Sequence, residues 1–152
     1  VMKRLVHNTR VLVVDGAKGR VLRNDGDVST PNLTLVRSYA QGNPATREQV
    51  SDRPGRTRVD ATRRAAVETT DWHDVAEVEF VTAVTADLDR DLRAGEFDSL
   101  VVIAAPAALG AYRRAASPAL AAATVHEVAK DLVHHTNAEI VGVVVKALEA
   151  AT

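Results

Sequence analysis

Six arginines gather in one stretch of the sequence, and their type and spacing are the strongest indication of binding chemistry. A Pro-Gly break at Pro54 and Gly55 lies among them, and the six are Arg47, Arg53, Arg56, Arg58, Arg63 and Arg64. Arginine presents a planar fork of five N–H donors that suits phosphate and carboxylate groups. The stretch therefore predicts an anion-binding loop centred on Gly55, with an RNA phosphate as the expected anion.

A solvated loop is the alternative interpretation of the same arginines. Four acidic residues between positions 40 and 70 oppose them, and Arg53 and Arg58 have Asp52 and Asp60 close by in the sequence. Surface ion pairs of this kind contribute only about 0–1 kcal/mol each. Salt separates the two interpretations, because every phosphate neutralised by an arginine makes binding weaker as salt rises.

Four other polar residues are candidates for a catalytic or metal-binding site: Asp15, Asp71, His73 and Asp98. Asp15 ends an apolar run, where a carboxylate could bind a divalent metal, but Asp-Gly is also a common hairpin turn. Metal catalysis needs further carboxylates close by, and nothing in the spacing brings Asp71 or Asp98 to Asp15. His73 is equally open to a capping or packing role.

Other enzyme chemistry finds little support in the sequence. The chain has no cysteine, which excludes disulfides, a thiol nucleophile and cysteine-based zinc sites. It also has no GxSxG, HExxH, GxGxxG or Walker motif. We therefore expect no metal and no cofactor, and a non-catalytic role is favoured over an enzyme.

Size and composition indicate one soluble domain. The 152 residues, 46% hydrophobic and 26% charged, suffice for a single core, so we expect one domain over 1–152. No apolar run approaches 18 residues and no signal-like segment opens the chain, so we expect a cytoplasmic protein without membrane insertion. Because the formal net charge is −1, any contact with nucleic acid must come from a local patch.

The apolar pattern predicts an α/β fold with a mixed sheet and helices on its faces. Runs over 10–15 and 20–24 indicate a hairpin, and alternation over 33–39 indicates a third antiparallel strand. The stretch from about 40 to 70 has no regular pattern, and we expect it to be a long basic loop. Loops of this length are often functional.

The second half of the chain predicts helices around a buried strand. The helix pattern over 71–95 has Asp71 as its expected cap and Gly95 as its stop. The apolar run 99–105 is typical of a central strand. Pro106 and Ser117-Pro118 open further helices, and 124–132 fits either a strand or a helix. A last helix is expected over 137–150, with Asn137 as its cap.

Several motifs together resemble the bacterial host attachment protein family, described as proteins required for attachment to host cells. The resemblance covers about residues 10–142 and rests on VLVVDGAKGRVLR, NPATREQ with DRPGR, TDWH, FDSLVVIAAPAALG and KDLVHH. The family in turn is similar to the central domain of the archaeal and eukaryotic peptide-chain release factor. That similarity implies a single-domain, ribonuclease-H-like fold.

The release-factor resemblance also locates the arginines. In that domain, a loop between the third strand and the long helix carries a Gly-Gly-Gln tripeptide that promotes hydrolysis of peptidyl-tRNA. The corresponding stretch here is 40–70, and Gly-Gly-Gln occurs nowhere in this chain. The resemblance therefore implies contact with the ribosome, without the same peptide-release chemistry.

Three functions remain open from the sequence. The favoured one is a cytoplasmic module that binds RNA or the ribosome through its arginine-rich loop. The second is an enzyme, either a translation-linked hydrolase or a metal-dependent nuclease. The third is an interaction protein, with a homodimer as one of its forms, that acts in host or surface attachment.

Overall fold

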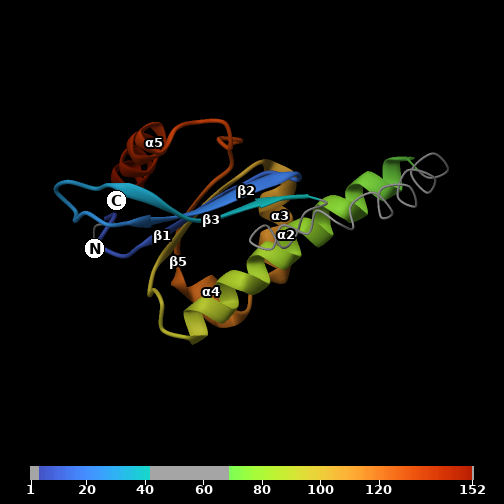
Figure 1. Ribbon diagram of the computed structural model, residues 1–152, viewed down its shortest axis with the longest axis horizontal. Helices are drawn as coiled ribbons and strands as arrows, with labels where there is room; N and C mark the ends of the chain where they lie inside the picture. The colour runs from blue at the N-terminus through green and yellow to red at the C-terminus, as the bar shows by residue number, and fades with distance from the viewer. Residues whose placement is uncertain (1–3, 42–68, 152) are drawn as a thin grey trace, which may run out of the picture.

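The structure is a computed structural model that describes residues 4–41 and 69–151, with the side chains of residues 69–74 excepted. This part of the chain forms one five-stranded sheet and four helices (Figure 1). The strands are β1 (Arg10–Val14), β2 (Lys18–Asn24), β3 (Leu33–Ala40), β4 (Leu100–Ala104) and β5 (Thr124–Val128). The helices are α2 (Thr69–Arg93), α3 (Pro106–Ala115), α4 (Pro118–Ala123) and α5 (Asn137–Ala150).

The strand order in the sheet is β3-β2-β1-β4-β5. β2 is antiparallel to both β1 and β3, whereas β1, β4 and β5 run parallel to one another. The expected mixed α/β sheet is confirmed. Its order differs from a separate block of three antiparallel strands, because β4 joins the free side of β1 and makes β1 the central strand.

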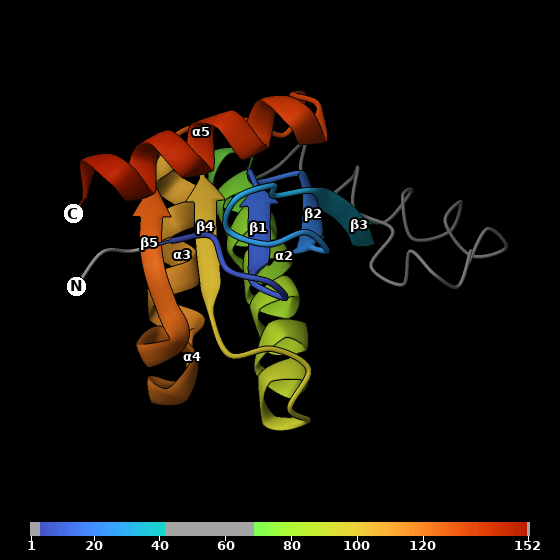
Figure 2. The ribbon, with the colours of Figure 1, turned by 90° about the vertical axis from the view of Figure 1, so that its left-hand side faces the viewer.

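Helices cover both faces of the sheet, which explains why every residue of β1 and β4 is buried (Figure 2). Successive side chains of a strand point to opposite faces. Leu12 and Val102 belong to the core shared with α2, α3 and α4. Val11 and Val101 belong to the core shared with α5. The result is a three-layer fold with the parallel pair β1–β4 at its centre.

The helix starts differ from the sequence-based expectation at two places. α2 begins at Thr69, so Asp71 lies inside the helix, and the prediction that it caps the helix is wrong. α5 is capped by Thr136, whose side chain accepts a hydrogen bond from the Glu139 N–H while the Glu139 carboxylate accepts one from the Thr136 N–H. This reciprocal capping box makes the prediction of Asn137 as the cap wrong.

Gly95 and the residues around β5 settle two further expectations. Gly95 follows α2 with φ of 80°, the left-handed conformation that ends helices, as predicted. The ambiguous stretch 124–132 is a strand only over Thr124–Val128, where it pairs with β4. In the described residues, no helix has the length and apolar character needed to cross a bilayer.

Asn24 is a buried amide that ties the N-terminal segment to the sheet. Its Nδ2 donates to the carbonyls of Leu5 and Val6, at 3.0 Å each. Its Oδ1 accepts from the N–H groups of Gly26 at 3.0 Å and Asn32 at 2.9 Å. All four hydrogen-bonding positions of the amide are therefore satisfied inside the protein.

We expect Asn24→Asp to lower the free energy of unfolding by about 2 kcal/mol or more, because it turns a buried carboxylate toward two carbonyl oxygens. Urea denaturation at pH 7 measures this loss. Asn32→Asp is the matched control, since Asn32 is exposed and its side chain makes no hydrogen bond in the described structure. Equal losses in the two variants would contradict the role of the amide.

Candidate functional site

The arginine candidates belong to the segment that joins β3 to α2. Gly55 and the six arginines lie outside the described residues, and they are Arg47, Arg53, Arg56, Arg58, Arg63 and Arg64. What the structure describes is where the chain enters and leaves this segment. β3 ends at Ala40 and is followed by Gln41, and α2 begins at Thr69. The attachment points are therefore known.

The attachment point on β3 belongs to the end of the sheet where β1 and β4 finish. β3 runs in the same direction as β1, because both are antiparallel to β2. Gln41, Asp15 and Ala105 thus follow strand ends on the same side, which we call the carboxyl end of the sheet. In open α/β sheets, ligands bind outside the carboxyl ends of the strands.

The tight turn after β1 is fastened to the end of β3. The Asp15 carboxylate accepts hydrogen bonds from the N–H groups of Ala17 at 2.8 Å and Lys18 at 2.7 Å. Gln41 donates from its side chain to the Gly16 carbonyl and from its main chain to the Ala17 carbonyl, both at 2.7 Å. Asp15 therefore has the role of a turn residue here, as the hairpin interpretation predicts.

α2 crosses directly over this turn. A Cβ placed on Gly16 would lie 2.6 Å from Cδ of Glu77, so a side chain at position 16 would displace Glu77. Beside the turn, α2 and α3 enclose a hollow of about 470 Å³ lined by Glu77, Val78, Pro106, Ala107, Ala108, Gly110, Ala111 and Arg114. Its walls are mainly apolar, with one acid and one base.

The four polar candidates do not form one site. Asp98 precedes β4 and lies at the amino end of the parallel pair, since Arg10 pairs with Leu100. A five-residue strand, about 16 Å long, therefore separates it from Asp15. Asp71 and His73 occupy the first turns of α2, and their side chains are outside the described residues. Among the described residues, no group of three His, Asp or Glu side chains could hold a metal ion.

A polar network that sequence reasoning missed fastens β3 to α2. The Tyr39 hydroxyl donates to Asp87 at 2.7 Å and accepts from Nε of Arg37 at 2.7 Å. Arg37 also pairs with Asp91, at 2.5 Å. The sequence does contain a signal for it. Arg37 and Tyr39 lie on one face of a strand, and Asp87 and Asp91 lie on one face of a helix. The network therefore joins the end of β3 to the second half of α2.

The network shifts the pKa of its members. Burial alone would raise the pKa of Asp87, but hydrogen bonds from Tyr39 and Arg90 outweigh it and leave that pKa below its ordinary value. Burial, aided by the hydrogen bond to Asp87, raises the pKa of Tyr39 well above the ordinary value. At neutral pH the pair is therefore a neutral phenol donating to a carboxylate.

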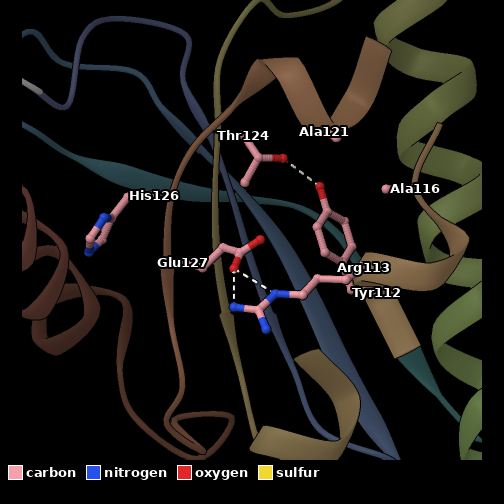
Figure 3. A pocket seen from close by; sticks show the side chains of 7 residues that line it. All are labelled: Tyr112, Arg113, Ala116, Ala121, Thr124, His126 and Glu127. Carbon is pink, nitrogen blue, oxygen red and sulfur yellow. Dashed lines mark hydrogen bonds and ion pairs between the residues drawn. The ribbon is translucent and has the colours of Figure 1, made fainter. Parts of the chain in front are cut away.

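A second hollow, of about 550 Å³, lies between β5, α3 and α4 (Figure 3). The Tyr112 hydroxyl is 2.6 Å from Oγ1 of Thr124, and burial raises the pKa of Tyr112 to about 12. Nε and Nη2 of Arg113 both donate to one carboxylate oxygen of Glu127, at 2.9 and 2.5 Å. Sequence reasoning missed this site, because it required knowing that β5 is a strand.

The fold and its carboxyl end define the protein as a three-layer α/β protein with a long insertion between its third strand and its first described helix. A family profile matches residues 10–144, nearly the whole chain, and its description is "Protein required for attachment to host cells". The chain belongs to this host attachment family. No curated protein matches the sequence.

We expect Tyr39→Phe to lower the free energy of unfolding by about 1–2 kcal/mol at pH 7, since it removes a hydrogen bond to a carboxylate. The lowered pKa of Asp87 stabilises the fold above the ordinary aspartate value of about 3.9 and is lost as pH falls through the folded value. The cost of the substitution should therefore shrink as pH falls below about 4. Denaturant titrations at several pH values measure it.

Tyr112→Phe is the matched control for this prediction. Its hydroxyl meets the Thr124 hydroxyl rather than a carboxylate. The cost of removing it should stay constant over the same pH range. A Tyr39→Phe cost that does not change with pH would show that the Asp87 contact adds nothing to stability.

Proposed function

We propose that the protein is a non-catalytic, cytoplasmic module that binds ribosomal RNA through the arginine-rich segment 47–64. One observation carries the proposal: β3 ends at the carboxyl end of the sheet, where the strands of α/β proteins present ligand sites, and the arginines follow in the sequence. Six arginines against four acids between residues 40 and 70 supply a local positive charge on a chain of net charge −1.

The relationship to the release-factor central domain is part of the proposal. The observed sheet supports a ribonuclease-H-like assignment, because an antiparallel meander is followed by parallel strands on the other side of β1. The position of segment 42–68 between the third strand and the long helix α2 supports the correspondence of the two loops. Because Gly-Gly-Gln is missing, we infer binding at the ribosome rather than peptide release.

An enzymatic function, as a translation-linked hydrolase or a metal-dependent nuclease, is less well supported. One carboxylate oxygen of Asp15 is occupied by two main-chain N–H groups of its turn. Asp98 lies at the other end of the parallel strands. The described polar candidates thus offer no convergent set of acids and bases.

A second candidate function is a role in attachment, and the family description favours it. We propose that such a role is exerted from the cytoplasm, through the same RNA contact. A deletion strain that loses attachment and regains it with the wild-type gene, but not with a gene lacking the arginines, would unite the two functions. If both genes restore attachment, the role in attachment does not depend on the arginines.

Replacing Arg53, Arg56 and Arg58 with alanine should weaken co-sedimentation with ribosomes. Each arginine that contacts a phosphate releases counterions, so the slope of log K against log salt should become shallower by about 2. Binding isotherms between 50 and 300 mM KCl provide this slope. Ribonuclease treatment of the ribosomes should abolish the co-sedimentation.

Arg4, Arg93 and Lys146 replaced together with alanine are the matched control, because they remove the same charge from exposed positions outside the polar network and the two hollows. This variant should bind ribosomes as the wild type does. Equal weakening of ribosome binding in both variants would show that only the net charge of the protein matters. Unchanged binding in the loop variant would rule out the proposed interface.

A further inference from the structure

β5 ends the sheet with one side unpaired in the described part of the chain. The strand order gives it a single neighbour, β4. Proteins normally protect such an outer edge with proline, lysine or a covering segment. The strand Thr124–Val128 contains neither proline nor lysine, and all five of its residues are only partly buried. The outer side of its main chain therefore has no hydrogen-bonded strand in the described part of the chain.

The hydrogen-bond pattern identifies which residue of β5 faces outward. The Arg10 N–H bonds to the Ser99 carbonyl, so the odd-numbered residues of β4 turn their main-chain groups toward β1. Val102 therefore turns toward β5, where its partner in the register is Glu127. In a parallel pair, such a residue bonds to the neighbours of its partner. Glu127 consequently directs its own N–H and C=O to the open side.

The hollow beside β5 adds side-chain recognition to this edge. Figure 3 shows Tyr112, Arg113, Thr124 and Glu127 gathered on one side of the strand, with His126 pointing away from them. Arg113 donates through Nε and Nη2 to Oε1 of Glu127. Its Nη1, and Oε2 of Glu127, have no partner among the described residues. The ion pair cancels its own charge, yet Nη1 remains available as a donor and Oε2 as an acceptor.

We propose that the outer edge of β5 binds an extended peptide of a partner protein as a sixth strand. The peptide exchanges main-chain hydrogen bonds with Glu127 and places an asparagine or glutamine side chain in the hollow. A primary amide both donates and accepts, so it satisfies Nη1 of Arg113 and Oε2 of Glu127 without bringing charge. Strand addition with a pocket for alternate side chains is an established mode of peptide recognition.

A second copy of β5 is a less suitable occupant. In the antiparallel register centred on the outward-facing residue, it would place two Glu127 carboxylates opposite each other, which is unfavourable. A peptide without charge at this position avoids the repulsion. The site is also independent of the arginine-rich segment, so its test needs no nucleic acid.

A phage-displayed library of random 12-residue peptides, selected on the full chain, provides the probe. We expect enriched peptides to carry Asn or Gln at one fixed position and to bind with micromolar Kd in fluorescence polarisation. N-methylation of the synthetic peptide, one residue at a time, should weaken binding at least tenfold at alternate positions only. This period of two is the signature of strand pairing. Absence of an enriched peptide, or of the alternation, would overturn the proposal.

Two protein variants locate the site. Glu127→Ala should weaken binding of the selected peptide about tenfold, whereas Glu149→Ala, which removes an exposed acid from α5, should leave it unchanged. Backbone amide NMR shifts on peptide addition should centre on β5. Shifts centred elsewhere, equal effects of the two variants, or a wild-type dimer in ultracentrifugation that Glu127→Ala dissociates would each refute peptide docking at β5.

Discussion

The parallel pairing of β1 with β4 is the constraint on which the rest of the structure depends. Every residue of both strands is buried, so each face of the pair must be covered by helices. α5 covers one face and α2, α3 and α4 cover the other (Figure 2). Because parallel neighbours need a crossover, the chain must travel from β3 to β4 over one face, and α2 is that crossover.

α2 is longer than a crossover of this sheet requires. Its 25 residues span about 37 Å, whereas a five-residue strand spans about 16 Å. The first turns of α2 therefore extend beyond the sheet at the carboxyl end, as Figure 1 shows. Tyr39 and Arg37 of β3 form hydrogen bonds with Asp87 and Asp91, which lie in the second half of the helix. The first turns of the helix lie beyond this network.

Residue patterns within a few positions of the sequence predicted most of the helices and strands. The other features depend on which strands and side chains pair in the fold. The apolar runs of β1 and β4, the Asp15 turn and the Gly95 stop are each encoded within a few residues. The cap of α5 was also encoded, since Thr136 and Glu139 form a T-x-x-E capping box, but Asn137 beside them competes as a capping residue. Asn137 instead accepts a hydrogen bond from Arg20, 117 residues away in the sequence.

Among the candidate sites, too, some are encoded locally in the sequence and others depend on the fold. The arginines can be recognised in the sequence because all six fall within residues 47–64. The Tyr39–Asp87 contact and the hollow at β5 join residues that are far apart in the chain or depend on the strand order. The stretch 124–128 becomes a strand only because the edge of β4 is available to it, and its apolar pattern alone fits a helix equally well.

The strand order also separates the two surfaces for which we propose functions. β3, from which the arginine-rich segment departs, and β5 lie at opposite sides of the sheet, four strand spacings or about 19 Å apart. Between them stands the buried pair β1–β4, a close-packed core that does not deform gradually. Under the two proposals, the domain would hold an RNA and a partner peptide at opposite sides of one sheet.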